Sequence, residues 1–221
     1  MRANEDEVVD ALVNRNKDII VSWESVRDQN PSEYIEKGYL DADDNVRLRT
    51  VSECCNCFGA GYKGFQGSGA KHKFEEDTDI KRLKFYPNGE WDNRLTSDGN
   101  RFTEFHINSA ENDKYAWSRL TELNQKIALF SHEKVSTAKY EAIFKGLYLV
   151  NKVESLKNKK VTYDRISKIM PTYYPKNVIA PKVIAEAYDK EGYMVAHFYD
   201  AEAVDAFRKK YEMKYIHPDF F

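Results

Sequence analysis

The chain has 221 residues, of which 42% are hydrophobic and 14% aromatic, and this is enough apolar material for the core of one large domain. No apolar run approaches the roughly 18 residues of a membrane-spanning helix, and the acidic N-terminus lacks the apolar stretch of a signal peptide, so we expect a cytoplasmic protein with no membrane partner. The net charge is only −2, but the charges are unevenly spread.

A basic block occupies residues 114–182, where 14 Lys and Arg residues stand against 5 Asp and Glu residues, a balance of +9. Residues 1–60 are acidic, with 7 basic residues against 13 acidic ones. The basic block predicts an anionic partner such as nucleic acid, although Lys-rich surfaces are as often simply solvated. The acidic segment is a candidate for docking on a basic protein partner.

The first 80 residues are predicted to form a helical and irregular N-terminal segment. Residues 5–20 have the apolar spacing of an amphipathic helix, and residues 32–40 follow the break at Asn30-Pro31 as a short helix. Residues 45–51 alternate apolar and charged side chains, as a half-buried strand does. Five glycines in residues 58–70 predict a loop.

Residues 81–180 are predicted to form a β-rich core. The turn Pro87-Asn88-Gly89 between two aromatic arms predicts a hairpin over residues 81–91, and residues 101–107 alternate as a strand. Residues 109–125 have a helical composition, and residues 126–132, 140–150 and 160–167 are typical of three successive strands. Residues 181–221 are predicted to pack on this core as helix, strand and helix, over residues 180–190, 193–200 and 201–212.

Three cysteines lie within four positions, at Cys54, Cys55 and Cys57. They are too close together for a disulfide framework, which favours a reducing compartment, and they lack the second pair that a structural zinc site needs. Buried or incidental thiols are therefore expected, with no metal and no cofactor. The glycine-rich loop lacks the Gly-Lys-Ser/Thr ending of a phosphate-binding loop.

A set of acids and one histidine supports a second hypothesis, a metal-dependent nuclease. Nucleases hold a divalent metal on carboxylates, and this chain offers Glu75, Asp77, Asp79, Glu104 and His106. Glu104 and His106 share a strand face because strand side chains repeat every two residues. These residues lack the spacing of a recognisable restriction-nuclease core, so no catalytic residue is assigned and an enzyme is the less favoured interpretation.

Aromatic and basic side chains are interleaved in the basic block. On the strand 140–150, Phe144, Gly146 and Tyr148 are predicted to share one face, with Lys145 on the other. A single strand aromatic more often belongs to a core, so the interpretation depends on the coincidence with the +9 block. Bases stack on aromatic faces and phosphates pair with cations, so the expected nucleic-acid-binding residues are Lys145, Lys152, Lys157, Lys159, Lys160 and Arg165.

The segments "YPNGEWDNRLTSDGNRFTEFH" and "YEAIFKGLYLVNKVESLKNKKVTYDRIS" resemble the strands of PUA-superfold β-barrels, which include SRA-like, EVE-like and ASCH-like domains. The resemblance covers residues 83–170. It implies an α+β fold with a central bent β-sheet or small barrel, and a module that binds a modified or flipped base. By residue type, Trp91, Asp92, Asn93 and either Tyr115 or Trp117 are the candidate groups of a base pocket.

Three functions remain open from the sequence. The first is a nucleic-acid-binding module of a defence system that recognises a modified or flipped base, in DNA more than in RNA. The second is the metal-dependent nuclease. The third is a protein-binding inhibitor of the phage counter-defence type, which would use the acidic N-terminal segment.

Overall fold

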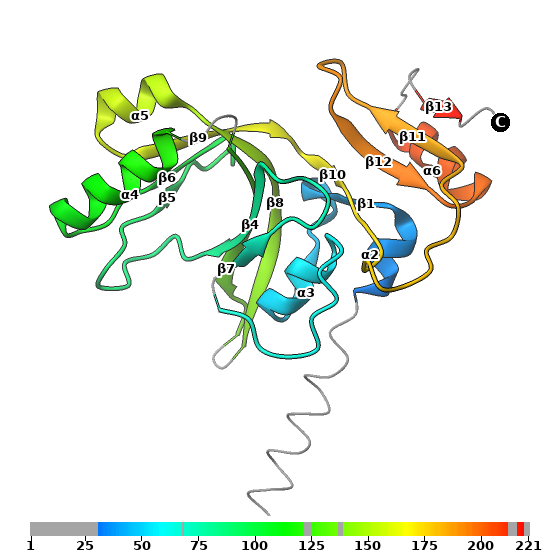
Figure 1. Cartoon of the computed structure of the whole chain (residues 1–221), viewed down its shortest axis with the longest axis horizontal. Coiled ribbons are helices and arrows are strands. Elements are labelled where there is room, and N and C mark those ends of the chain that lie inside the picture. The colour runs from blue at the N-terminus through cyan, green and yellow to red at the C-terminus, as the bar shows by residue number, and fades with distance from the viewer. Residues whose placement is uncertain (1–30, 68, 122–124, 137–138, 212–215, 219–221) are drawn as a thin grey trace, which may run out of the picture.

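An open, bent β-sheet organises the chain in this computed structural model (Figure 1). The structure describes residues 31–67, 69–121, 125–136, 139–211 and 216–218. The helix predicted over residues 5–20 and half of the acidic segment, residues 1–30, lie outside these ranges. In the part described, no helix is long and apolar enough to cross a membrane.

The main sheet has eight strands. Its order is β3 (Gly69–Lys71), β4 (Thr78–Leu83), β7 (Lys126–Lys134), β8 (Tyr140–Val150), β9 (Val161–Ser167), β6 (Arg101–Glu104) and β5 (Arg94–Leu95), and β2 (Arg47–Leu48) pairs with β8 off this path. Strands β4 and β7 run parallel, and the other pairs are antiparallel. The two end strands, β3 and β5, do not pair with each other in the described residues, so the sheet is bent rather than closed into a barrel.

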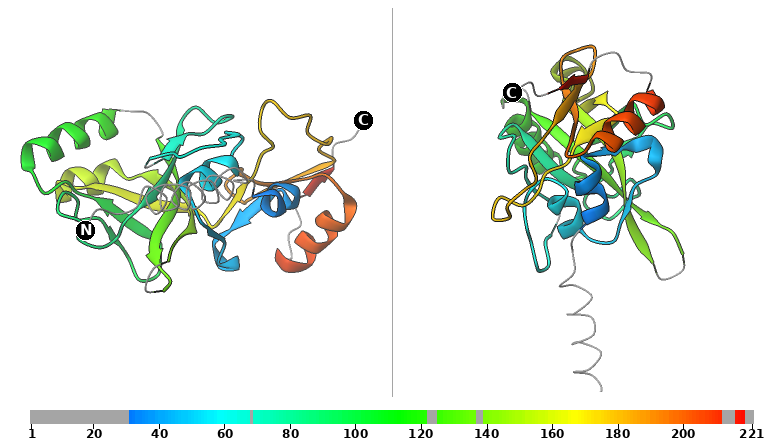
Figure 2. Two further views of the ribbon diagram at one scale, coloured as in Figure 1. Left: turned by 90° about the horizontal axis from the view of Figure 1, so that it is seen from below. Right: turned by 90° about the vertical axis from the view of Figure 1, so that its right-hand side faces the viewer.

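Two smaller sheets complete the fold. Strands β1 (Tyr39–Asp41) and β10 (Ile169–Pro171) form a pair, and the C-terminal sheet has the order β12 (Met194–Phe198), β11 (Ala185–Tyr188), β13 (Ile216–Pro218). The C-terminal sheet packs its buried side on α6 (Ala201–Tyr211) through Val195, Phe198 and Phe207. Figures 1 and 2 place α6 and α4 (Ser109–Thr121) at opposite ends of the molecule.

Two predictions of local structure are wrong, and a third element is shorter than expected. Residues 180–190 contain β11 rather than a helix, because Ala185 and Ala187 are buried at every second position between two partner strands. Residues 81–91 form no hairpin: β4 ends at Leu83 and pairs with β3 and β7, while Trp91 makes only an isolated bridge to His106. The strand expected over residues 45–51 is shortened to β2.

The remaining helices are short and begin with side-chain caps or end at glycine. Thr50 caps α3 (Val51–Asn56) by accepting from the Glu53 N–H at 3.1 Å, and Asn151 caps α5 (Lys152–Asn158) by accepting from the Glu154 N–H at 3.0 Å. Helix α2 (Ser32–Lys37) ends at Gly38, which has a left-handed φ of 84°. Helix α5 interrupts the predicted succession of strands and was not anticipated.

The main sheet has a buried core on each face. The α3 face packs Ile80, Phe130 and Phe144 against Cys54 and Phe58. The α4 face packs Phe102, Ile127, Leu129, Tyr148 and Tyr163 against the apolar side of α4. The described part of residues 1–80 therefore shares the core of the β-rich strands.

A β-bulge at Lys145 sends Phe144 and Tyr148 to opposite faces of the sheet. Phe144 pairs with Phe130, but Gly146 pairs with Leu129, so Lys145 is an extra residue in β8. Gly146 has a φ of +120°, and its missing side chain leaves room for the backbone oxygen of Ser167. Both aromatic residues are fully buried as expected, but the prediction that they share one face is wrong.

Candidate functional site

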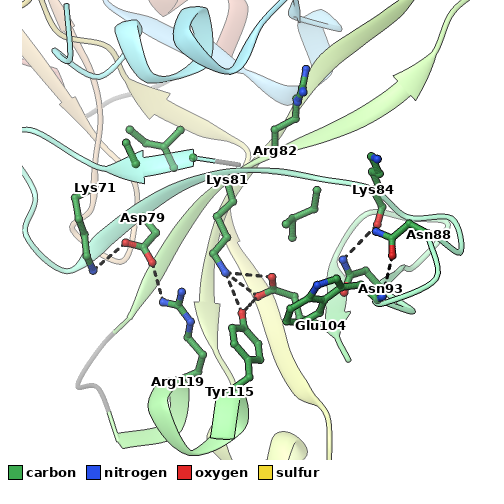
Figure 3. A pocket seen from close by; sticks show the side chains of 15 residues that line it. Lys71, Asp79, Lys81, Arg82, Lys84, Asn88, Asn93, Glu104, Tyr115 and Arg119 are labelled. Atoms are coloured by element: carbon green, nitrogen blue, oxygen red, sulfur yellow. Dashed lines mark hydrogen bonds and ion pairs between the residues drawn. The ribbon is translucent and has the colours of Figure 1, made fainter. Parts of the chain in front are cut away.

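A pocket of about 560 Å³ opens on the α4 face at the edge of the main sheet (Figure 3). Strands β3 and β4 form one wall, the end of β6 and α4 form the other, and residues 84–93 close one end. The residues that line it include Lys71, Asp79, Lys81, Arg82, Lys84, Asn88, Trp91, Asn93, Glu104, Tyr115 and Arg119. Its volume lies in the range of roughly 300–1,000 Å³ that is usual for small-ligand sites.

The strand periodicity of β4 brings a buried lysine into this pocket. Ile80 packs into the α3 face, so Lys81 points to the α4 face, where its Nζ lies 3.0 and 3.1 Å from the two carboxylate oxygens of Glu104. The same Nζ lies 2.9 Å from the Tyr115 hydroxyl, which itself donates to Glu104. Burial lowers the pKa of Lys81 and raises the pKa of Tyr115 well above its usual value. These three groups form a pre-organised polar floor with hydrogen-bond donors and acceptors.

Asp79 is the second buried carboxylate of the pocket. It accepts hydrogen bonds or ion pairs from Lys71 at 2.8 Å, Arg119 at 2.8 Å and Gln125 at 2.9 Å. Burial acts to raise the pKa of Asp79, but its bonds to Lys71 and Arg119 outweigh burial and hold the pKa below its usual value. The aspartate is therefore ionised, and it orients two cations along the wall.

Trp91 and Asn93 close the end of the pocket. The Trp91 ring packs edge-on against Tyr115 at 5.0 Å, and its backbone N–H donates to the side chain of Asn88 at 2.8 Å. Asn93 is buried; its side-chain amide donates to the Lys84 carbonyl at 3.3 Å and accepts from the Phe105 N–H at 3.3 Å. These bonds tie the 84–93 segment to β6 and hold the indole in place.

The pocket carries an excess of positive charge. Three cations point into it, Lys71, Lys81 and Arg119, against the two carboxylates Asp79 and Glu104. Two of these cations, Lys71 and Lys81, come from residues 61–113, which hold 8 basic and 10 acidic residues, so the charge count did not indicate a basic site there. The signal that was present is the alternation of Asp79, Lys81 and Leu83, which places all three on one strand face.

The residues expected to form a base pocket are only partly brought together. Trp91, Asn93 and Tyr115 line the pocket. Asp92 lies outside the lining and forms an ion pair with Arg94 at 2.6 Å. Trp117 is 74% exposed on α4, because two helical positions beyond Tyr115 turn a side chain to the far side of the helix.

None of the predicted nucleic-acid-binding cations lines the pocket. Lys145 pairs with Glu133 at 2.8 Å, and Arg165 donates to Asn100 at 2.6 Å and to the carbonyls of Asp98 and Lys145, so both hold strands together. Lys152 and Lys157 lie on α5, Lys159 follows it, and Lys160 covers the Phe105 ring at 4.8 Å. Lys157 and Lys159 are exposed.

Of the five residues considered for nuclease chemistry, only Asp79 and Glu104 line the pocket. Glu75 and Asp77 both pair with Lys126, at 3.1 and 3.2 Å, and His106 packs against the ring of Trp91. Within the ranges the structure describes, no group of three or more His, Cys, Asp or Glu residues is placed to hold a metal ion. Cys54, Cys55 and Cys57 are buried, and burial raises the pKa of Cys55 to about 12.

Comparisons with known proteins relate this arrangement to a domain family and to a solved structure. The model of the SET and RING associated (SRA) domain family matches residues 33–172, which include every element around the pocket and extend the resemblance found over residues 83–170 toward the N-terminus. A solved structure, "The 5-Hydroxymethylcytosine-Specific Restriction Enzyme AbaSI", is 27% identical with a TM-score of 0.59. The match covers 77% of this chain and 56% of that one, so this chain spans little more than half the length of that enzyme. No curated protein matches.

Proposed function

The chain belongs to the SRA domain family, and on this premise we propose that it is a DNA-binding module whose pocket recognises a modified base. The observation that carries the proposal is that one pocket, within the matched residues, combines a buried polar floor, aromatic rings and an excess of cations. The structural neighbour is a restriction enzyme specific for 5-hydroxymethylcytosine, which makes this base the first ligand to test.

The pocket groups supply the contacts that an extruded base requires. An extruded base is held by stacking and by hydrogen bonds to its polar edge. Trp91 and Tyr115 supply ring surface, and the Lys81 ammonium and Glu104 carboxylate supply a donor and an acceptor. Lys71 and Arg119 on the pocket wall supply positive charge for the phosphates beside the nucleotide.

Cleavage of DNA is not part of the proposal. Glu75, Asp77, Asp79 and Glu104 each pair with a lysine or arginine, which leaves them engaged in ion pairs rather than gathered around a metal position. A protein partner for the acidic N-terminal segment, and the cytoplasm as the location, remain predictions from the sequence.

The proposal is tested by binding labelled duplex DNA with one 5-hydroxymethylcytosine, and the same duplex with cytosine, by fluorescence anisotropy in EDTA. We expect the protein to prefer the modified duplex. Trp91→Ala should lower affinity for it roughly 5- to 150-fold, which corresponds to the loss of one stacking contact of about 1–3 kcal/mol. Affinity for the cytosine duplex should stay unchanged.

Trp117→Ala is the matched control, since it removes an exposed indole from α4 outside the pocket lining. Its preference for the modified duplex should equal that of the wild type. Equal affinity of the wild-type protein for both duplexes, or an equal loss in both tryptophan variants, would contradict a base pocket at Trp91.

A further inference from the structure

One end of the α3 face of the main sheet, called the bare end below, lies outside the buried core. Residues directly opposite one another on neighbouring strands share a face, and the pairs Phe130–Phe144, His132–Ala142 and Lys134–Tyr140 therefore follow one another along the same side of β7 and β8. The buried core on this side ends at Phe130, Ala142 and Phe144. Beyond it the face continues with His132, Lys134 and Tyr140, which are half-buried or exposed.

Two cations border the same bare end: Arg82 lies on β4, and Lys84 lies in the segment that follows it. Arg82 pairs in register with Phe130, so its side chain lies on the α3 face, and Lys84 follows at the next position of that face. Figure 3 shows Arg82 and Lys84 pointing away from Lys81, on the other side of β4. Their strand segment thus separates the pocket from the bare end of the α3 face.

Three aromatic rings contact one another at the bare end and are partly exposed to solvent. The Tyr140 ring stacks on His132 at 4.7 Å with an interplanar angle of 27°, and the Tyr86 hydroxyl lies 3.0 Å from His132 Nδ1. Tyr86 and Tyr140 remain 39% and 43% exposed, so the assembly is not part of a core. His132 is held between the two tyrosines, which presents the Tyr140 side of the stack to solvent.

The charge around these rings is positive. Among the described residues, Arg82, Lys84 and Lys134 take part in none of the ion pairs. Burial, Arg82 and Lys84 together lower the pKa of His132. The ring assembly therefore lies beside three cations that no carboxylate of the described chain neutralises.

We propose that Tyr86, His132 and Tyr140, with Arg82, Lys84 and Lys134, form a second DNA-binding surface, the stacking patch. An unpaired base stacks on Tyr140, and the cations hold the phosphates beside it. The inference rests on the proposed DNA binding, but it assigns a separate contact on the other face of β4. Extrusion of one base into the pocket leaves its partner base unpaired. The stacking patch is separated from the pocket only by strand β4, so it lies near that unpaired base.

The test compares an unmodified single-stranded DNA with the 5-hydroxymethylcytosine duplex, at two salt concentrations. Tyr140→Ala should lower affinity for the single strand roughly 5-fold or more and lower affinity for both duplexes by a common factor, leaving the preference for the modified base intact. Tyr140→Phe should retain wild-type affinity, because it keeps the ring. Arg82→Gln with Lys84→Gln should reduce the salt dependence of single-strand binding.

The pocket variant Trp91→Ala separates this inference from the proposed function. If Tyr140→Ala leaves every affinity unchanged while Trp91→Ala removes the preference for the modified duplex, the stacking patch is wrong and the pocket stands. If Tyr140→Ala affects only the modified duplex, the tyrosine belongs to the pocket and the separate surface is overturned. Self-association in sedimentation velocity that Tyr140→Ala abolishes, with DNA affinities unchanged, would assign the bare face to a second copy of the chain.

Discussion

At the scale of single residues, His72 is the clearest case of a side chain whose protonation state is set by its bonds. Its Nδ1 accepts from the backbone N–H groups of Phe74 and Glu75, at 3.1 and 2.9 Å, and the side chain is buried against Phe58 and Tyr173. Burial lowers the pKa of His72 to about 4. The neutral imidazole therefore holds the turn that leads into β4 and its pocket residues.

This arrangement predicts a loss of stability in mild acid. The folded pKa of about 4 lies below the ordinary value of 6.5, so the unfolded chain binds more protons between these limits and the free energy of unfolding falls as pH decreases from 6.5 to 4. The loss due to His72 should reach about 3 kcal/mol at pH 4. Urea unfolding at pH 7, 6, 5 and 4 measures it.

His72→Asn keeps an acceptor for the backbone bonds and removes the titration. The variant should be less stable than the wild type at pH 7 but should lose less stability on acidification. His197→Asn is the comparison, because His197 also has a pKa lowered to about 4 by burial. An unchanged pH dependence in His72→Asn would contradict the assignment.

At the scale of elements, the β-bulge of β8 decides which side chains reach which face. Adding one residue to one strand of a ladder reverses the inside–outside pattern of everything that follows. Without the extra residue at Lys145, Tyr148 would share the α3 face with Phe144 and leave the Phe102 and Tyr163 rings that it packs with. The bulge requires glycine at position 146, because β9 lies too close to this position to leave room for a side chain.

Gly146→Ala is therefore expected to destabilise the fold strongly. A Cβ at this position would lie 2.5 Å from the Ser167 carbonyl oxygen and 2.8 Å from Arg165 Cδ, at a φ of +120° that alanine rarely adopts. We expect a loss of about 2–4 kcal/mol in the free energy of unfolding, measured by urea titration.

Gly192→Ala is the control, since Gly192 also has a positive φ, of +85°, but a Cβ there meets nothing within 4 Å. It should lose only about 1 kcal/mol, the cost of the left-handed conformation alone. Equal losses in the two variants would show that contact with β9 does not restrict position 146.

At the scale of the whole molecule, positive charge lies in two places despite the net charge of −2. One is the pocket and the stacking patch, and the other is the exposed surface of α5 and the residues after it, which carries Lys157 and Lys159. The second surface has no pocket and no exposed stack of rings among its described residues. Such a surface contributes long-range attraction to DNA without base recognition.

Reversal of Lys157, Lys159 and Lys160 to Glu should lower affinity for modified and unmodified duplexes by the same factor. If these side chains each meet one phosphate, the slope of log affinity against log salt should become shallower by about 2–3. Lys190→Glu, in the turn between β11 and β12, is the control and should change neither quantity. Unchanged affinity in the triple variant would identify the predicted basic block as a solvated surface.

The sequence by itself determined the elements whose pattern is local. Strands β7, β8 and β9 and helices α2, α4 and α6 lie where periodicity and composition place them, and the resemblance to SRA-like domains followed from the same stretch. Trp91 and Asn93 were identifiable as pocket residues by type, since both lie in one short turn-rich segment. These features depend on neighbours within a few positions along the chain.

Only the tertiary structure decided the features that depend on distant partners. The polar floor joins Lys81 to Glu104 and the wall joins Asp79 to Arg119, and no local pattern indicates which of many acids and bases meet. The bulge at Lys145 depends on the approach of β9 to Gly146, and β11 is a strand because β12 and β13 pair with both its edges. Local propensities differ by at most about 1 kcal/mol per residue, so pairing and burial between distant segments outweigh them.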